Sequence, residues 1–132
     1  MTTERIGVLI GLLHDDDIEQ RRRAAESLAH LGPDALPAVL HLVQACGDAD
    51  EQVREWSAAA LESLPTPNTE VAEPLVALLS APLDIAYWAA TLLGRIGSPA
   101  GNAKHALTTT ATQHPDPAVR RRAAWALEKI GE

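Results

Sequence analysis

The sequence contains no phenylalanine, one tyrosine and one cysteine among its 132 residues, although 46% of them are apolar. So low an aromatic content disfavours a β-sandwich, in which aromatic and β-branched residues are enriched. The single cysteine, Cys46, excludes an internal disulfide and fits a reducing compartment. Because Ala and Leu supply the apolar residues instead, the composition favours closely packed helices.

Long apolar runs are also missing. The apolar stretch from Ile6 to Leu13 is followed almost at once by the three aspartates Asp15–Asp17, and no small-residue cleavage site follows it. The stretch is too short to cross a bilayer and is a poor signal peptide. We therefore expect a cytoplasmic protein without a membrane partner, in which Cys46 is a small buried apolar residue.

Acidic residues outnumber basic ones and give a formal net charge of −7. Binding to nucleic acid depends on neutralising phosphates with Lys and Arg, so this charge argues against a nucleic-acid partner. The arginines are nevertheless concentrated, because six of them form the triplets Arg21–Arg23 and Arg120–Arg122. The sequence thus predicts local basic stripes on an acidic protein.

A repeat of about 33 residues is the strongest pattern in the chain. Four segments align without gaps: DIEQRRRAAESLAHLG (17–32), DEQVREWSAAALESLP (50–65), PLDIAYWAATLLGRIG (82–97) and DPAVRRRAAWALEKIG (116–131). Their equivalent leucines are Leu28, Leu61, Leu93 and Leu127, which lie 33, 32 and 34 residues apart. Apolar residues recur at helical spacing within each segment and in the shorter stretch before it, so each unit is expected to be a helical hairpin.

The ends of these segments also fit helices. Three segments end in glycine (Gly32, Gly97 and Gly131) and one ends in Pro65, residues that commonly stop a helix. Acidic residues at the starts of the second helices, such as Asp17 and Asp50, are expected to act as N-caps. We therefore predict one domain, residues 1–132, with repeats at about 4–32, 33–65, 66–97 and 98–131.

The second-helix pattern Asp-x-x-Val-Arg-x-x-Ala-Ala-x-Ala-Leu-x-x-Ile-Gly resembles HEAT repeats, specifically the short HEAT-like repeats of phycobilisome lyases. The resemblance covers the whole chain and implies an all-α fold, a right-handed α-solenoid (α-α superhelix) of four HEAT-like hairpins. It also implies that the second helices line a concave face, and that Asp and Arg side chains form a ladder between adjacent repeats. Because the third repeat has Pro82 and Ala86 at those positions, we expect the ladder to be interrupted there.

All four aromatic residues lie on second helices, outside the stripe expected to be buried. Trp, Tyr and Arg are enriched in binding hot spots. We therefore take a binding groove as the main hypothesis, lined by Arg23, Trp56, Tyr87, Trp88, Arg122 and Trp125. The alternative is that the rings cover Ala-rich helix surfaces and stack on arginines of the next repeat.

The sequence contains no recognisable catalytic or metal-binding pattern. The five histidines are scattered, with no His-x-x-x-His pair and none of the His-Glu dipeptides that bind iron in HEAT-like deoxyhypusine hydroxylases. We therefore expect no metal site, no cofactor and no catalytic residues. HEAT-like DNA glycosylases suggest a basic face made of Arg23, Arg95, Arg122 and Lys129, but nearby acidic residues argue against it.

The sequence favours a non-catalytic adaptor or scaffold that binds a protein or peptide on the concave face, without excluding an enzyme. The alternative is an auxiliary lyase or isomerase that holds a small aromatic or conjugated, apolar ligand between Trp56, Trp88 and Trp125. The apolar helix expected at residues 6–13 also leaves end-to-end self-association open, because terminal repeats normally carry polar outer faces.

Overall fold

The computed structural model describes residues 3–131, so residues 1, 2 and 132 of the expected domain lie outside the described residues. No strand occurs in the described range, and none of its helices is both long and apolar enough to cross a membrane. The chain divides into two compact units, one ending at Pro65 and the other beginning at Thr66. Each unit contains two helical hairpins.

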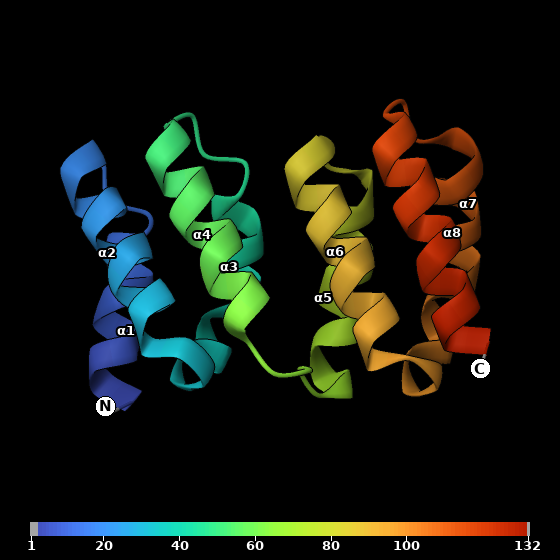
Figure 1. The fold of residues 1–132 in the computed structure, drawn as a ribbon, viewed down its shortest axis with the longest axis horizontal. Helices are drawn as coiled ribbons and strands as arrows, with labels where there is room; N and C mark the ends of the chain where they lie inside the picture. Colours follow the sequence, from blue (N-terminus) through green and yellow to red (C-terminus); the bar gives the residue numbers. More distant parts are fainter. Residues whose placement is uncertain (1–2, 132) are drawn as a thin grey trace. The chain divides into compact units, whose positions relative to one another are not determined.

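In the first unit, α2 and α4 lie side by side, with α1 and α3 behind them in the view of Figure 1. Its elements are α1 (Thr3–Leu12), α2 (Ile18–Leu31), η1 (Gly32–Ala38), α3 (Val39–Ala45) and α4 (Glu51–Ser63). In the second unit, α6 and α8 pack side by side, and α5 and α7 lie behind them. Its elements are η2 (Thr69–Val71), α5 (Ala72–Ala77), η3 (Leu78–Ser80), α6 (Leu83–Ile96), η4 (Ser98–Ala103), α7 (Lys104–Gln113) and α8 (Pro117–Gly131).

The second helices of the hairpins are continuous, whereas three of the four first helices are interrupted by 3-10 turns. Pro37 lies in η1, and its missing N–H prevents the regular α-helical bond at that position. By contrast, α6 ends at Gly97 with a φ of 74°, and α2 ends at Gly32 with a φ of 60°. These positive φ values favour glycine, so the two predicted helix stops are confirmed.

The predicted acidic N-caps are also confirmed. Asp17 accepts a hydrogen bond from the Glu19 N–H, and Asp50 accepts one from the Val53 N–H at 3.0 Å. Pro82 precedes α6 and makes no side-chain cap. The core is built from leucine and alanine. Leu28, Leu61 and Leu93 are fully buried, and only 2% of the surface of Cys46 is exposed.

An arginine in three of the four repeats binds the loop that precedes its own helix. The Nη1 atom of Arg21 donates to the carbonyls of Asp15 and Asp16 at 2.8 and 3.1 Å. Arg54 and Arg120 make the same pair of bonds to their own loops. Ala86 takes this position in the third repeat and cannot donate such bonds.

Between the two hairpins of the first unit an Arg–Asp ladder is present, but Asp50 pairs with Arg22 rather than with an arginine at the expected Arg21 position, and Arg21 pairs with Asp48 instead. Arg21 Nε lies 3.0 Å from Asp48 Oδ2, and Arg22 binds both carboxylate oxygens of Asp50 at 3.0 and 2.7 Å. A bidentate ion pair of this kind is among the stronger ones, because the planar guanidinium donates two charge-assisted hydrogen bonds to the same carboxylate. It lowers the pKa of Asp50 from 3.8 to about 2.

This pKa predicts an acid-sensitive contact. The folded state keeps Asp50 charged, so the stability that the Arg22 bond contributes is present above the ordinary pKa of 3.8 and is lost as the pH falls towards about 2. We expect the urea midpoint of the wild type to fall between about pH 4 and pH 2, and that of Asp50→Asn to fall less, since Asn still caps the helix. An equal fall in both proteins would contradict the assignment.

Candidate functional site

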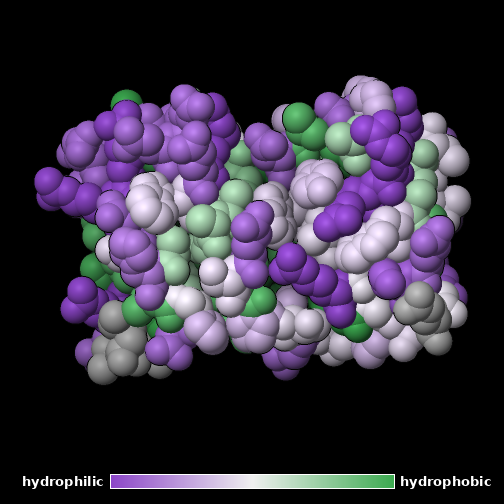
Figure 2. Space-filling view, in the orientation of Figure 1, coloured by the Kyte–Doolittle hydropathy of each residue, from purple (hydrophilic) through white to green (hydrophobic). Residues whose placement is uncertain are grey.

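The six residues of the predicted groove fall into two sets, one in each unit. Arg23 lies on α2 and Trp56 on α4 of the first unit, whereas the other four lie on α6 and α8 of the second. Figure 2 views the face that carries the second helices. Over α6 and α8, pale side chains of intermediate hydropathy alternate there with hydrophilic ones in purple.

Trp88 does not lie on an open surface as predicted, because it is buried, with 9% of its area exposed. Beyond Asp84, the only exposed residue of α6 is Arg95. The helix is apolar on almost every side, and such a helix is buried in a fold. Trp88 is therefore a core residue, whose ring meets Tyr87 edge-on and lies 5.6 Å from the Arg95 guanidinium.

Arg122 on α8 is held between two aromatic rings. Its Cζ atom lies 4.1 Å from the centre of the Trp125 ring and 5.1 Å from the centre of the Tyr87 ring. Its Nε donates to the hydroxyl of Thr91 at 2.9 Å, and this hydroxyl donates to the Tyr87 carbonyl at 2.7 Å. Thr91 is 1% exposed, so a buried hydrogen bond and two rings fix the guanidinium.

Gly94 on α6 makes room for the Trp125 ring. A Cβ atom at this position would overlap Cζ3 of Trp125 and lie 2.9 Å from Cε3, closer than van der Waals contact allows. The equivalent residue of α2 is Ala29, and that of α8 is Glu128. The absence of a side chain at Gly94 therefore lets the Trp125 ring of the fourth repeat lie directly against α6 of the third.

A small cavity opens beside this stack. It has a volume of about 270 Å³ and is lined by Tyr87, Ala118, Arg121, Arg122 and Trp125. Three of these residues belong to the predicted groove, and Arg121 was missed. Among residues 3–131, no acidic side chain forms an ion pair with Arg121 or Arg122. The sequence signal was the second arginine triplet, of which only Arg122 was selected.

In the first unit, Trp56 is half-buried and meets the ring of His30 edge-on, with the ring centres 5.4 Å apart. Arg23 is exposed. The structure thus brings together Tyr87, Arg122 and Trp125 in the second unit, whereas Arg23 and Trp56 lie on α2 and α4 of the first unit. Arg122 of the fourth repeat stacks on Tyr87 of the third. Such stacking between repeats was part of the alternative to a binding groove.

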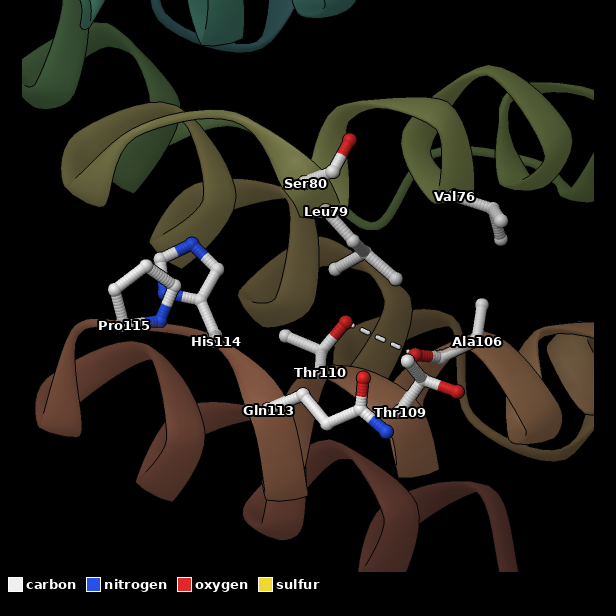
Figure 3. Close-up of a pocket in the computed structure, with 9 residues that line it drawn as sticks. All are labelled: Val76, Leu79, Ser80, Ala106, Thr109, Thr110, Gln113, His114 and Pro115. Atoms are coloured by element: carbon white, nitrogen blue, oxygen red, sulfur yellow. Dashed lines mark hydrogen bonds between the residues drawn. The ribbon is translucent and has the colours of Figure 1, made fainter.

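A second pocket of the second unit lies on the first helices and was not predicted. Its volume is about 360 Å³, and Figure 3 shows its lining between α5–η3 and α7. The lining residues are Val76, Leu79, Ser80, Ala106, Thr109, Thr110, Gln113, His114 and Pro115. Thr110 donates to the Ala106 carbonyl, and His114 Nε2 binds the Ala81 carbonyl at 2.9 Å, so several of its polar groups are already bonded.

A third, wider pocket of about 650 Å³ lies in the same unit, towards the starts of the first helices. It is lined by Thr69, Glu70, Ala72, Glu73, Val76, Pro99, Ala100, Asn102 and Ala103. All nine residues lie on η2, α5 or η4, and the helical pattern of these segments gave no indication of a pocket between them.

The histidines do not assemble a metal centre. In the described part of the chain, no three His, Cys, Asp or Glu side chains are grouped so that they could hold a metal ion. His14 and His41 share a hydrogen bond of 2.9 Å between their ring nitrogens. Burial and, to a smaller extent, the neighbouring His14 lower the pKa of His41, which favours the uncharged form of that imidazole.

Comparison with known proteins gives a family and a fold. A family model described as HEAT repeats matches residues 6–85 and 72–132. None of the curated proteins matches the sequence. Similar solved structures include an engineered protein of the Northeast Structural Genomics Consortium, with a TM-score of 0.60 and 26% identity over 98% of this chain and 64% of its own. Another engineered protein from the same source has a TM-score of 0.58 and 26% identity, with coverage of 96% and 62%.

A designed armadillo repeat protein in complex with the peptide (KR)4 has a TM-score of 0.57 and 22% identity over 96% of this chain and 64% of its own. The chain therefore spans less than two thirds of the length of these structures. At this identity the armadillo protein shows the fold alone. These similarities confirm the predicted all-α solenoid of helical hairpins.

The contact between Gly94 and Trp125 can be tested by adding one methyl group. We expect Gly94→Ala to lower the free energy of unfolding by up to about 2 kcal/mol, because overpacking costs about 1–3 kcal/mol and the better helix propensity of Ala returns about 1. Denaturant unfolding and the near-UV circular dichroism of tryptophan measure both effects. Gly7→Ala is the matched control, since nothing lies within 4 Å of its Cβ position and it should stabilise the protein. Equal stability of the two variants would argue against the contact.

Proposed function

Since the chain belongs to the HEAT-repeat family, we propose that it is a non-catalytic adaptor that binds a peptide segment of a partner protein on its second helices. The observation that carries this proposal is the Arg122 stack and the cavity beside it. An arginine held by Thr91, Tyr87 and Trp125 needs little further ordering when a ligand binds. Such preorganisation lowers the entropic cost of binding.

The size of the cavity favours a peptide side chain over a whole small molecule. Its volume is about 270 Å³, whereas pockets for drug-sized ligands span about 300–1,000 Å³. One side chain of a peptide fills such a space, while the rest of the segment lies across the neighbouring surface. A buried anchor with a surrounding rim is the usual form of a binding hot spot.

The charge of the cavity indicates the chemistry of that anchor. Arg121 and Arg122 border it without a carboxylate partner in the described part of the chain. Guanidinium groups bind carboxylates with two parallel hydrogen bonds. The proposed ligand is therefore a segment with an acidic residue next to an apolar or aromatic one, which would meet Tyr87 and Trp125.

In the first unit, Trp56 is partly exposed and Arg23 is exposed, so each is accessible to a partner on that unit. Peptide binding also has a precedent in this fold class, since the designed armadillo protein is described in complex with (KR)4. That peptide is basic, whereas the two arginines of the present cavity favour an acidic one.

A small apolar ligand is a second candidate, and the pocket between α5 and α7 supports it. Its volume of about 360 Å³ falls within the range of small-molecule sites, and Val76, Leu79 and Ala106 make its wall largely apolar. This location differs from the one expected between the tryptophans, because Trp88 is buried. The two candidates therefore predict ligands on different faces of the second unit.

Selection from a displayed library of random 12-residue peptides tests the adaptor function. We expect enriched peptides to carry Asp or Glu beside an apolar residue, and Arg122→Ala to weaken their binding about tenfold or more, as expected for a hot-spot side chain that contributes at least about 1.4 kcal/mol. Fluorescence anisotropy of one labelled peptide measures the loss.

Thr109→Ala serves as the control, because Thr109 is exposed on α7 and lines the other pocket. It should bind the peptide as the wild type does. Circular dichroism confirms that each variant is folded. The adaptor proposal fails if no peptide is enriched, or if Thr109→Ala and Arg122→Ala bind equally well.

A further inference from the structure

The ion-pair ladder of the first unit has a defined pattern. Two neighbouring arginines, Arg21 and Arg22, lie in the second turn of α2 and act as donors. The acceptors, Asp48 and Asp50, lie two residues apart in the loop before α4. One arginine pairs with each carboxylate, at 3.0 Å for Asp48 and 2.7 Å for Asp50.

The equivalent positions of the other repeats show where this pattern recurs. The donor pair is repeated only by Arg120 and Arg121 of the fourth repeat, and the acceptor pair only by Asp15 and Asp17 of the first. The remaining donor positions hold Arg54, Glu55, Ala86 and Tyr87, and the remaining acceptor positions hold Ser80, Pro82, His114 and Asp116. A complete second ladder would therefore join the fourth repeat to the first.

Arg120 has the local geometry of the arginine that is paired within the chain. Its Nη1 binds the carbonyls of His114 and Pro115 at 2.7 and 3.2 Å, as Arg21 Nη1 binds its own loop. Arg121 is exposed on the same turn of α8. Arg120 therefore repeats the loop bonds of Arg21, and Arg121 occupies the sequence position of Arg22 beside it.

The acceptors are arranged in the same way. Asp15 Oδ1 accepts the Asp17 N–H at 2.8 Å, as Asp48 Oδ1 accepts the Asp50 N–H at 2.9 Å. Asp17 caps α2 as Asp50 caps α4. The side chain of Asp15 therefore accepts the same loop hydrogen bond as that of Asp48 in the Arg–Asp ladder of the first unit.

Neither pair has an ionic partner among residues 3–131. No carboxylate lies within ion-pair distance of Arg120 or Arg121, and no cationic side chain pairs with Asp15 or Asp17. The surfaces around them also resemble an uncovered repeat junction. Ala124 of α8 is exposed, whereas Ala25, at the same position of α2, is fully buried.

Apolar exposure does not distinguish this surface, since Ile18 is 44% exposed and its equivalent in the third repeat, Leu83, is 41% exposed. The two charge pairs without ionic partners among residues 3–131 therefore carry the inference of a missing neighbour by themselves.

We propose that a second copy of this chain is that neighbour, bound head-to-tail through Arg120 and Arg121 of one copy and Asp15 and Asp17 of the other. The contact repeats the ladder that joins the first two hairpins within the chain. Because the two surfaces differ, the association is heterologous, and a dimer still has one free donor surface and one free acceptor surface. This inference does not rest on the proposed peptide site, although the two share Arg121, which also lines the cavity beside Arg122.

Sedimentation velocity of the wild type at rising concentration gives the first test. We expect oligomers to form as the concentration approaches about 1 mM, and to dissociate when NaCl is raised from about 50 to 500 mM, because salt screens exposed charges. A protein that stays monomeric over this whole range at low salt would overturn the proposal.

Two blocked variants then identify the surfaces. Asp15→Asn with Asp17→Asn removes the acceptor charges and keeps the N-cap, since Asn caps as well as Asp. Arg121→Glu reverses an exposed donor that has no partner among the described residues. Each variant alone should associate at least about tenfold more weakly than the wild type, because like charges now face each other or a charge is missing.

Mixing the two blocked variants is the decisive step. The acceptor variant still has its arginines and the donor variant still has its aspartates, so an equimolar mixture should form a one-to-one dimer and nothing larger. Lys104→Glu, the same charge reversal at another exposed site, should associate as the wild type does. Association that persists in both blocked variants, or a mixture that stays monomeric, would refute the head-to-tail contact.

Discussion

The close approach of successive second helices is the contact on which the rest of the structure depends. Small residues make it feasible: Ala24 and Ala25 are fully buried on α2, and Ala89 and Ala90 are fully buried on α6. Without large side chains between them, helices can pack at the short end of the usual distance of about 8–10 Å. Each hairpin buries its apolar side only against its neighbours, so stability arises repeat by repeat.

This contact also builds the candidate site. Gly94 and Thr91 leave a shallow surface on α6, and Trp125 and Arg122 of α8 occupy it. The same residues therefore join two repeats and hold a guanidinium at the edge of a cavity. A site built on two helices is more rigid than one built on loops, which suits the recognition of a partner segment.

Local sequence patterns predicted the hairpins, the acidic caps and the glycine stops, because each depends on residues close in the chain. The burial of Trp88 was missed because it depends on how α6 is surrounded, although the near absence of charges in that helix was a usable signal. The loop bonds of Arg21, Arg54 and Arg120 were missed as well, since the repeat pattern does not distinguish a bond to a carbonyl from one to a carboxylate. The pockets on the first helices were missed because a periodic pattern predicts a helix but not the spaces left between neighbouring helices.

The packing of Trp125 against Gly94 joins the fold and the site in a single contact, and proton NMR can observe it directly. The structure predicts strong nuclear Overhauser effects between the Gly94 Hα protons and the Trp125 protons at Cζ3 and Cε3, together with a ring-current displacement of the Gly94 Hα shifts. Absence of these cross-peaks, with Gly94 at ordinary helical shifts, would contradict the proposed arrangement of α6, α8 and the arginine between the rings.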